Sequence, residues 1–318
     1  MTTKRHKKCK KNYFRSCFFC VFLWLNIFIF TGCAEQIRKP TKICPGKESV
    51  ADVISVIESR TQSVVPFRAN GKCRLEYYDD GKPRKENFTV KIWFNPVRSY
   101  SQEGTYTMSL TSNGVNPLAE VSLQGDIAFD PKGIVLGSNE NEFWLAVRLK
   151  EVSSYWSGNW KDIGHIDELI ISPRLVLEAF GMAEVGRGQE NCSLYTEGAF
   201  DVLSRRDDNG RLIRKIYIYN CDYSIRKIEY FDVNGKIRVS AELDKYKQLS
   251  EEFYIPMRIK ITKYGKSAED LTNVIVSLTS IRQYSFSQKQ RNILFMPPKQ
   301  SDYKHIYTNI DGKWIEQQ

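Results

Sequence analysis

The feature that most constrains the fold is a long series of apolar and polar residues in alternation, from about residue 71 to residue 285. Alternation with a period of two predicts a strand that buries one face. Turn dipeptides at 80–81, 209–210 and 234–235 separate such runs, and Asp-Gly and Asn-Gly are typical of tight hairpins. The chain is therefore expected to form an antiparallel meander. The clearest buried faces are Phe143, Leu145 and Val147 in one run and Ile255, Met257, Ile259 and Ile261 in another.

About eleven strands can be read from the sequence, and the last run must divide near Gly265. They lie near residues 73–79, 85–95, 98–110, 119–129, 133–138, 142–149, 193–205, 211–220, 224–231, 237–247 and 253–284. This many strands with so few helices excludes a doubly wound fold, which alternates the two throughout. We find no internal boundary between residues 48 and 318, so we expect one domain there.

Two amphipathic helices interrupt the strands. The first covers residues 48–62, where Val50, Val53, Ile54 and Ile57 form a single apolar stripe. The second begins after Ser172, has Pro173 in its first turn and ends at Gly181. The sheet is expected to curl around both helices. Their apolar residues, Val53 and Ile57 in the first and Leu175, Val176 and Phe180 in the second, would then act as a lid.

The N-terminus has the layout of a secretory signal. A basic stretch at 4–15 precedes an uncharged apolar run at 16–30 and the sequence Phe30-Thr31-Gly32-Cys33. This ending resembles a bacterial lipoprotein lipobox, which implies acylation of Cys33, cleavage before it, and a signal peptide at 1–32. Ala34 follows the cysteine, and the same resemblance implies that delivery to the outer membrane, facing the periplasm, is favoured over retention at the inner membrane. Residues 33–47 would form a tether between the lipid anchor and the domain.

Two other interpretations of this leader remain open. It could be an uncleaved anchor helix, although about 15 apolar residues fall short of the roughly 20 that span a bilayer. It could also be an ordinary cleaved signal peptide. All three interpretations place the body in the bacterial cell envelope, outside the cytoplasm.

The charge of the chain belongs mainly to this leader. Seven of the 47 Lys and Arg residues precede residue 33 with no acidic residue beside them, which leaves 40 basic against 37 acidic residues in the rest. A nearly neutral body lacks the basic surface that nucleic-acid binding requires. We therefore expect no nucleic-acid partner.

Four cysteines remain in the body, at Cys44, Cys73, Cys192 and Cys221. Four thiols in an oxidising compartment allow three disulfide pairings, and the sequence does not choose among them. We favour Cys44 with Cys73 and Cys192 with Cys221, although a hairpin at 208–209 leaves Cys192 out of register with Cys221. The spacings contain no short ligand pair, so no metal site is expected.

The sequence contains no catalytic motif and no cofactor-binding motif. The body has only His165 and His305, and His165 has no identified partner, although Asp167 and Glu168 follow it. We therefore expect a protein without catalytic residues and without a cofactor. The densest aromatic cluster is Trp144, Tyr155, Trp156 and Trp160, which suits a lipid pocket or a core better than a glycan-binding surface.

Four stretches together resemble the LolA/LolB-like lipoprotein group. They are EYYDDGKPRKENFTVKIWF, NEFWLAVRLKEVSSYWSGNW, ISPRLVLEAFG and the hairpins from residue 199 to residue 236, and the resemblance spans most of residues 48–300. It implies an incomplete antiparallel β-barrel of about eleven strands, with helices lidding its concave face. It also implies an apolar interior that takes acyl chains of lipoproteins or other lipids. The same fold could instead serve as a protein-interaction or stress-sensing module with no lipid ligand.

Overall fold

The computed structural model describes residues 42–79, 81–97, 99–100, 106–107, 119–127, 130–148, 153–160, 173–183, 185, 189–265 and 271–317. All of them belong to the unit Thr41–Gln318. The signal sequence, Cys33 and most of the expected tether lie outside the described residues, so acylation of Cys33 stays a prediction. His165 and its acidic neighbours also lie outside them.

The body is mainly β, as the sequence predicts. Its helices are α2 (Val50–Gln62), α3 (Pro173–Ala179) and α4 (Gln288–Leu294), with the 3-10 turns η3 (Gln189–Asn191) and η5 (Gln300–Asp302). Its strands are β1 (Phe67–Asp79), β2 (Lys82–Pro96), β3 (Ser99–Tyr100), β4 (Tyr106–Thr107), β5 (Ala119–Ile127), β6 (Asp130–Ser138), β7 (Glu142–Arg148), β8 (Ser153–Asn159), β9 (Cys192–Glu197), β10 (Phe200–Arg206), β11 (Leu212–Tyr219), β12 (Ile225–Phe231), β13 (Ile237–Gln248), β14 (Tyr254–Lys263), β15 (Thr272–Gln283), β16 (His305–Ile310) and β17 (Lys313–Gln317).

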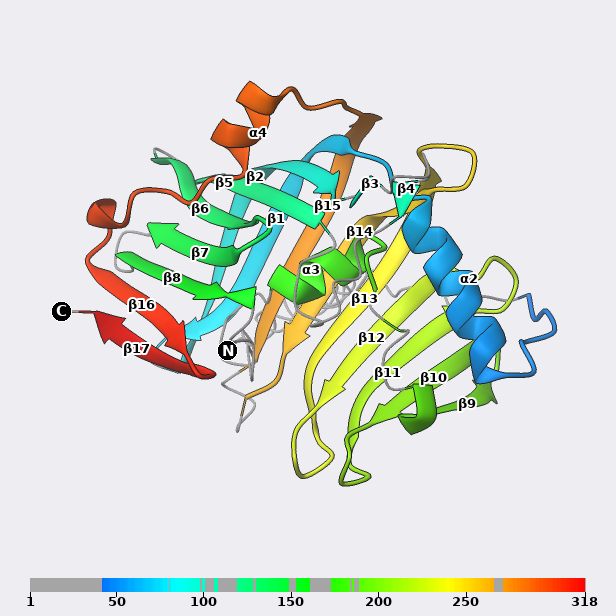
Figure 1. Ribbon diagram of the computed structural model, residues 1–318. Helices are drawn as coiled ribbons and strands as arrows, with labels where there is room; N and C mark the ends of the chain where they lie inside the picture. The colour runs from blue at the N-terminus through cyan, green and yellow to red at the C-terminus, as the bar shows by residue number, and fades with distance from the viewer. Residues whose placement is uncertain are drawn as a thin grey trace, which may run out of the picture. The chain divides into compact units, whose positions relative to one another are not determined.

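Fifteen strands form one open sheet in the order β17-β16-β8-β7-β6-β5-β2-β1-β15-β14-β13-β12-β11-β10-β9 (Figure 1). Among the described residues, the two outermost strands β17 and β9 do not pair with each other. Neighbouring strands run antiparallel, except that β16 pairs with β8 in parallel. The expected incomplete antiparallel barrel is therefore confirmed, with fifteen strands in place of about eleven.

The hairpins form where the turn dipeptides predict them. Gly81, Gly210 and Gly235 all have positive φ, between 70° and 77°, a conformation that glycine adopts without steric cost. One turn without this signature was missed, at Gly198 (φ 61°). The run 193–205, expected as one strand, is consequently the hairpin β9–β10. The prediction also missed the C-terminal elements α4, β16 and β17.

Both faces of the sheet carry buried side chains. The inner face, which bears α2 and α3, holds most of the core, including Phe67, Phe94 and Phe143, each fully buried. The outer face of β6–β8 holds a second, smaller cluster of Val135, Trp144, Ala146 and Tyr155, which Tyr303 covers. The segment after α4 therefore makes β6–β8 a layer that is buried on both sides.

The sheet curves around α3. This seven-residue helix contacts both β6 and β13 (Figure 1), which are six strand positions apart in the sheet. Six steps of about 4.8 Å measure roughly 29 Å along a sheet, whereas a helix of seven residues is only about 10 Å long. The two halves of the sheet must therefore bend toward the helix that lies between them.

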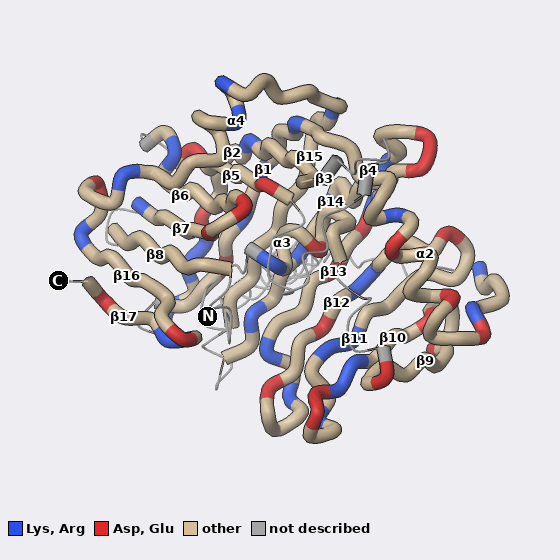
Figure 2. The backbone as a smooth tube through the Cα atoms, in the orientation of Figure 1, with Lys and Arg blue, Asp and Glu red and all other residues tan. Residues whose placement is uncertain are grey.

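Basic and acidic residues are interspersed along the described strands and at the hairpin tips (Figure 2). In the part of the chain that the structure describes, no helix is long and apolar enough to cross a membrane.

Candidate functional site

Helix α3 closes the inner face of the sheet, and its sequence explains where it ends. Gly181, with φ 96°, takes the left-handed conformation that terminates a helix. Its backbone N–H donates to the Glu178 carbonyl (3.0 Å), and the N–H of Met182 donates to the Leu177 carbonyl (3.0 Å). These two bonds form a Schellman motif, which satisfies carbonyls that a helix end leaves open. The helix end predicted at Gly181 is thus confirmed.

A small apolar cavity lies between α3 and the sheet. Its volume is about 30 Å³, and every lining side chain is apolar. Such a space equals roughly one water molecule, far below the 300 Å³ or more typical of ligand pockets. The interior is therefore nearly filled by its own side chains. The lining residues come from α3 and its C-terminal turn and from six strands: Cys73, Phe88, Ile92, Leu123, Ile134, Val176, Ala179, Phe180, Ile259, Ile261, Val274 and Val276.

On its other side α3 carries a buried carboxylate. Glu178 accepts a hydrogen bond from the Arg214 guanidinium of β11 at 2.9 Å, and the two side chains are 1% and 5% exposed. The Tyr230 hydroxyl of β12 donates to the second carboxylate oxygen. Burial, and next the Glu178 charge, raise the pKa of Tyr230, so that this hydroxyl keeps its proton and donates. Arg174 adds a more exposed contact at 3.5 Å. We call Glu178, Arg214 and Tyr230 the α3 latch.

A second pocket, of about 40 Å³, lies beside the latch. We call it the Arg60 pocket, because Arg60 of α2 lines it together with three tyrosines. Its lining residues are Ile57, Arg60, Glu178, Ala179, Gly181, Tyr223, Ser224, Ile225, Leu243, Tyr246, Glu252, Phe253, Tyr254 and Pro256. Ala179 and the neighbouring turn thus border both hollows.

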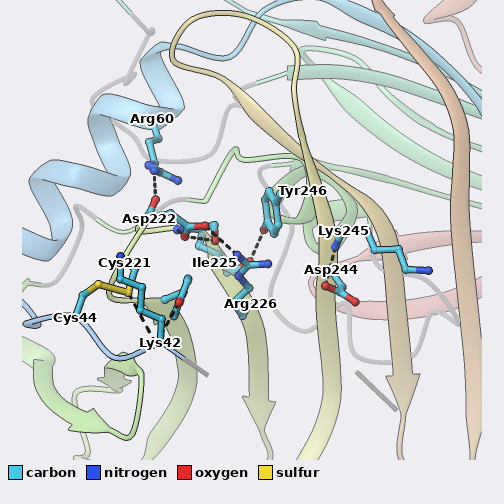
Figure 3. Close-up of polar contacts among 12 residues, drawn as sticks. Lys42, Cys44, Arg60, Cys221, Asp222, Ile225, Arg226, Asp244, Lys245 and Tyr246 are labelled. Atoms are coloured by element: carbon cyan, nitrogen blue, oxygen red, sulfur yellow. Dashed lines mark hydrogen bonds and ion pairs between the residues drawn. A yellow bond between two sulfur atoms is a disulfide. The ribbon is translucent and has the colours of Figure 1, made fainter. Parts of the chain in front are cut away.

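The Arg60 side chain points from α2 toward the turn between β11 and β12 (Figure 3). Its guanidinium donates to the Asp222 carbonyl. The Asp222 carboxylate is itself paired with Arg226 at 2.9 Å, and it accepts from the Ser224 hydroxyl. Arg226 in turn lies over the Tyr246 ring, 4.7 Å from its centroid. These contacts fix the geometry of the pocket wall.

The same turn carries the disulfide. Cys44 and Cys221 are bonded, with Cα atoms 5.0 Å apart (Figure 3), while Cys73 and Cys192 are thiols. The favoured pairing of Cys44 with Cys73 and Cys192 with Cys221 is therefore wrong. The mistake for Cys192 follows from the missed hairpin. Cys192 begins β9 and Cys221 follows β11, and β10 lies between these two strands in the sheet. Cys73 instead faces the apolar cavity.

The predicted cavity residues divide into two groups. Ile259, Ile261, Val176 and Phe180 line the cavity. The others lie in or against the surrounding core without lining it: Val53, Ile57, Phe143, Leu145, Val147, Leu175 and Ile255 are buried, and Met257 is half-buried. Ile57 lines the Arg60 pocket instead.

Sequence reasoning missed the cavity residues of the central strands. Cys73 of β1 pairs with Phe88 of β2 on one side and with Val276 of β15 on the other. The alternation in Phe88, Val90 and Ile92 indicates that one face of this strand is buried. It does not indicate which strands lie beside it or which residues face it across the core. The pairing of β1 with β15 joins residues about 200 positions apart, and no local signal announces it.

The aromatic cluster of the sequence does not converge on one site. Trp144 and Tyr155 lie in the outer-face cluster, whereas Trp160 belongs to the main core and Trp156 packs against that core. His305 is exposed, with Nδ1 2.8 Å from a Glu316 oxygen. Within the described residues, no group of three or more His, Cys, Asp or Glu side chains could hold a metal ion.

No protein-family model matches the chain, and no curated protein matches it. Among solved structures, it is similar to a putative outer membrane lipoprotein-sorting protein domain from Vibrio parahaemolyticus, at 12% identity and a TM-score of 0.45, with 78% of this chain and 100% of that chain covered. It is also similar to a LolA superfamily protein from Nitrosomonas europaea (11% identity, TM-score 0.43, 77% and 97% covered). The fold resembles that of LolA-like proteins.

A DUF1329 family protein from Desulfovibrio piger is similar as well, at 8% identity and a TM-score of 0.47, with 77% and 97% covered. Identities of this size assign no role to any residue of this chain. The function of the body is therefore argued from its own geometry.

Proposed function

We propose that the body binds acyl chains in the apolar interior beneath α3 and takes part in lipoprotein or lipid handling, without catalysis. The observation that carries this proposal is the cavity between α3 and the curved sheet, whose lining is apolar throughout. Each methylene group transferred from water into such an interior contributes about 0.8 kcal/mol, so a chain needs no specific polar contact to be held.

An acyl chain enters this interior only if α3 moves outward, because about 30 Å³ does not hold one. The helix is suited to such a movement: it has only seven residues, and a single buried polar group, Glu178, ties it to β11 and β12. In the proposed cycle, α3 closes over the interior in the empty protein and is displaced by the chain.

Two features support a place in the cell envelope. The leader has the layout of a lipoprotein signal, and the Cys44–Cys221 disulfide is of a kind that persists in oxidising compartments. We propose that acylated Cys33 anchors the body to a membrane, with the periplasmic face of the outer membrane favoured over the inner membrane.

The test is titration of the purified protein with a fluorescent C12 acyl probe, together with native mass spectrometry of co-purified lipid. Val276→Phe places an aromatic ring in the cavity and is expected to weaken probe binding at least tenfold. Ser277→Phe places the same ring on the exposed side of β15 and serves as the matched control. Absence of both probe binding and co-purified lipid would contradict the proposal.

The second candidate is a protein-interaction module with no lipid ligand. The small volume of the cavity favours it, because a filled interior needs no ligand to be stable. This alternative would be supported by two results together: a protein partner crosslinks to α2 or α3 in cells, and the purified protein does not bind the acyl probe.

A further inference from the structure

Arg60 is a half-buried cation, and the nearby Asp222 carboxylate offsets the cost of its burial only in part. Among the described residues it makes no ion pair, and its one hydrogen bond is to a backbone carbonyl, that of Asp222. A guanidinium has five N–H donors, so most of them remain available toward the pocket. Burial lowers the pKa of Arg60, which reflects the poor solvation of its charge there.

The acidic groups around the pocket are largely neutralised by other partners. Glu178 is held by Arg214 in the α3 latch, and Asp222 is paired with Arg226. Glu252 is exposed to solvent and accepts a long hydrogen bond from the Ser63 hydroxyl at 3.3 Å. The charge of an exposed side chain is weakened by water, so Glu252 opposes the half-buried guanidinium only weakly.

The Arg60 pocket and the apolar cavity are neighbours. Ala179, a small side chain on α3, lines both. In the sheet below, Leu243 of the pocket lies opposite Ile259 of the cavity in the β13–β14 register. One continuous strip of the inner face therefore leads from a cationic hollow to a wholly apolar one.

We infer that the Arg60 pocket binds the oxyanion head group of an amphiphile, a carboxylate or a phosphate, whose acyl chain occupies the cavity beneath α3. This inference rests on the proposed function and specifies the ligand class. Arg60 would donate charge-assisted hydrogen bonds to the head group. The tyrosine rings and the turn after α3 would shield these bonds from water. The protein should consequently discriminate between amphiphiles of equal chain length by the charge of the head group.

The experiment compares laurate with 1-dodecanol, below their aggregation concentrations, as competitors of the acyl probe in the full-length protein. We expect the wild type to bind laurate about tenfold more tightly than dodecanol, the value of one charge-assisted hydrogen bond. Arg60→Gln is expected to remove this preference, and Arg60→Lys to retain part of it. Glu252→Gln should increase the preference, because it removes the opposing charge.

Lys247→Gln is the matched control, since it removes an exposed charge from β13 outside the pocket and should leave the preference unchanged. Dodecanol binding with no preference for laurate, or an undiminished preference in folded Arg60→Gln, would overturn this inference alone. Binding of neither amphiphile would overturn the proposed function, and the inference with it. Inorganic phosphate that competes as well as laurate would show a free-anion site and would also overturn the amphiphile assignment.

Discussion

The Glu178 carboxylate of α3 lies 2.9 Å from the Arg214 guanidinium of β11, and both side chains are almost entirely buried. The opposite side of the same short helix lines an apolar cavity. One helix thus combines an apolar face with a buried carboxylate, and a charge is costly to bury unless it is paired. The position of α3 therefore depends on a buried polar contact as well as on apolar packing, while the space beneath it is apolar.

Loss of the Glu178 charge should destabilise the fold strongly. Glu178→Gln leaves the Arg214 guanidinium buried without its counter-charge, and we expect a loss of about 3–5 kcal/mol in the free energy of unfolding. The double variant Glu178→Leu with Arg214→Met should recover most of it, because no buried charge remains in the α3 latch. Urea unfolding measures both effects. Glu58→Gln, an exposed change on α2, is the control. Equal stability of Glu178→Gln and the wild type would show that the latch is not a stabilising contact.

The Cys44–Cys221 disulfide should contribute to stability through the 177 positions that it spans. Cys44→Ser, Cys221→Ser and the double variant should each lose about 2–5 kcal/mol, and to the same extent. Thermal unfolding measures the loss. Mass spectrometry after alkylation under denaturing, non-reducing conditions should find two of the four body cysteines modified in the wild type, and three cysteines modified in either single variant. Protection of Cys73 in that assay would indicate a different pairing.

Cys73 should report on opening of the cavity. Burial raises the pKa of its thiol to about 12, so that the reactive thiolate is scarce at neutral pH. We expect N-ethylmaleimide to modify Cys73 much more slowly than Cys192. The difference between the two alkylation rates should be smaller in Glu178→Gln, because α3 is less firmly held in that variant. Peptide mass spectrometry over time distinguishes the two sites. Equal rates in the wild type would contradict a closed interior.

The same thiol predicts a pH dependence of stability. The folded protein keeps the Cys73 proton up to a pKa of about 12, whereas in the unfolded chain the thiol titrates near its ordinary value of 9.0. Between these values the unfolded state binds fewer protons, so this contribution to stability is complete below pH 9 and falls as the pH rises, by about 1.4 kcal/mol per unit. Cys73→Ala lacks the contribution of this thiol to the pH dependence of stability. Its stability should therefore depend less steeply on pH between 9 and 11 in urea titrations.

Local signals predicted local structure well. Pro173 and Gly181 marked the two ends of α3, because a proline without an N–H and a glycine with positive φ each suit one helix end only. The alternation in 253–263 identified Ile259 and Ile261 as buried. Both lie at the cavity, because this strand happens to cross beneath α3.

What the sequence did not contain was the pairing of distant strands. The cavity residues Cys73 and Val276 become neighbours only through the β1–β15 register, and Arg214 meets Glu178 only because β11 curves toward α3. The wrong disulfide pairing has the same origin, since one missed turn at Gly198 changes which strands are adjacent. Such contacts depend on the whole sheet, and local periodicity carries no information about them.

The disulfide has a further mechanical consequence if the body is tethered to a membrane through Cys33, as proposed. Cys44 precedes α2 in the chain, yet it is bonded to the turn between β11 and β12. A pulling force that enters through Lys42 would pass across the sulfur bridge into the hydrogen-bonded strands, and α2 would carry no load. Under such a force, α2 and its residue Arg60 would keep their position in the body.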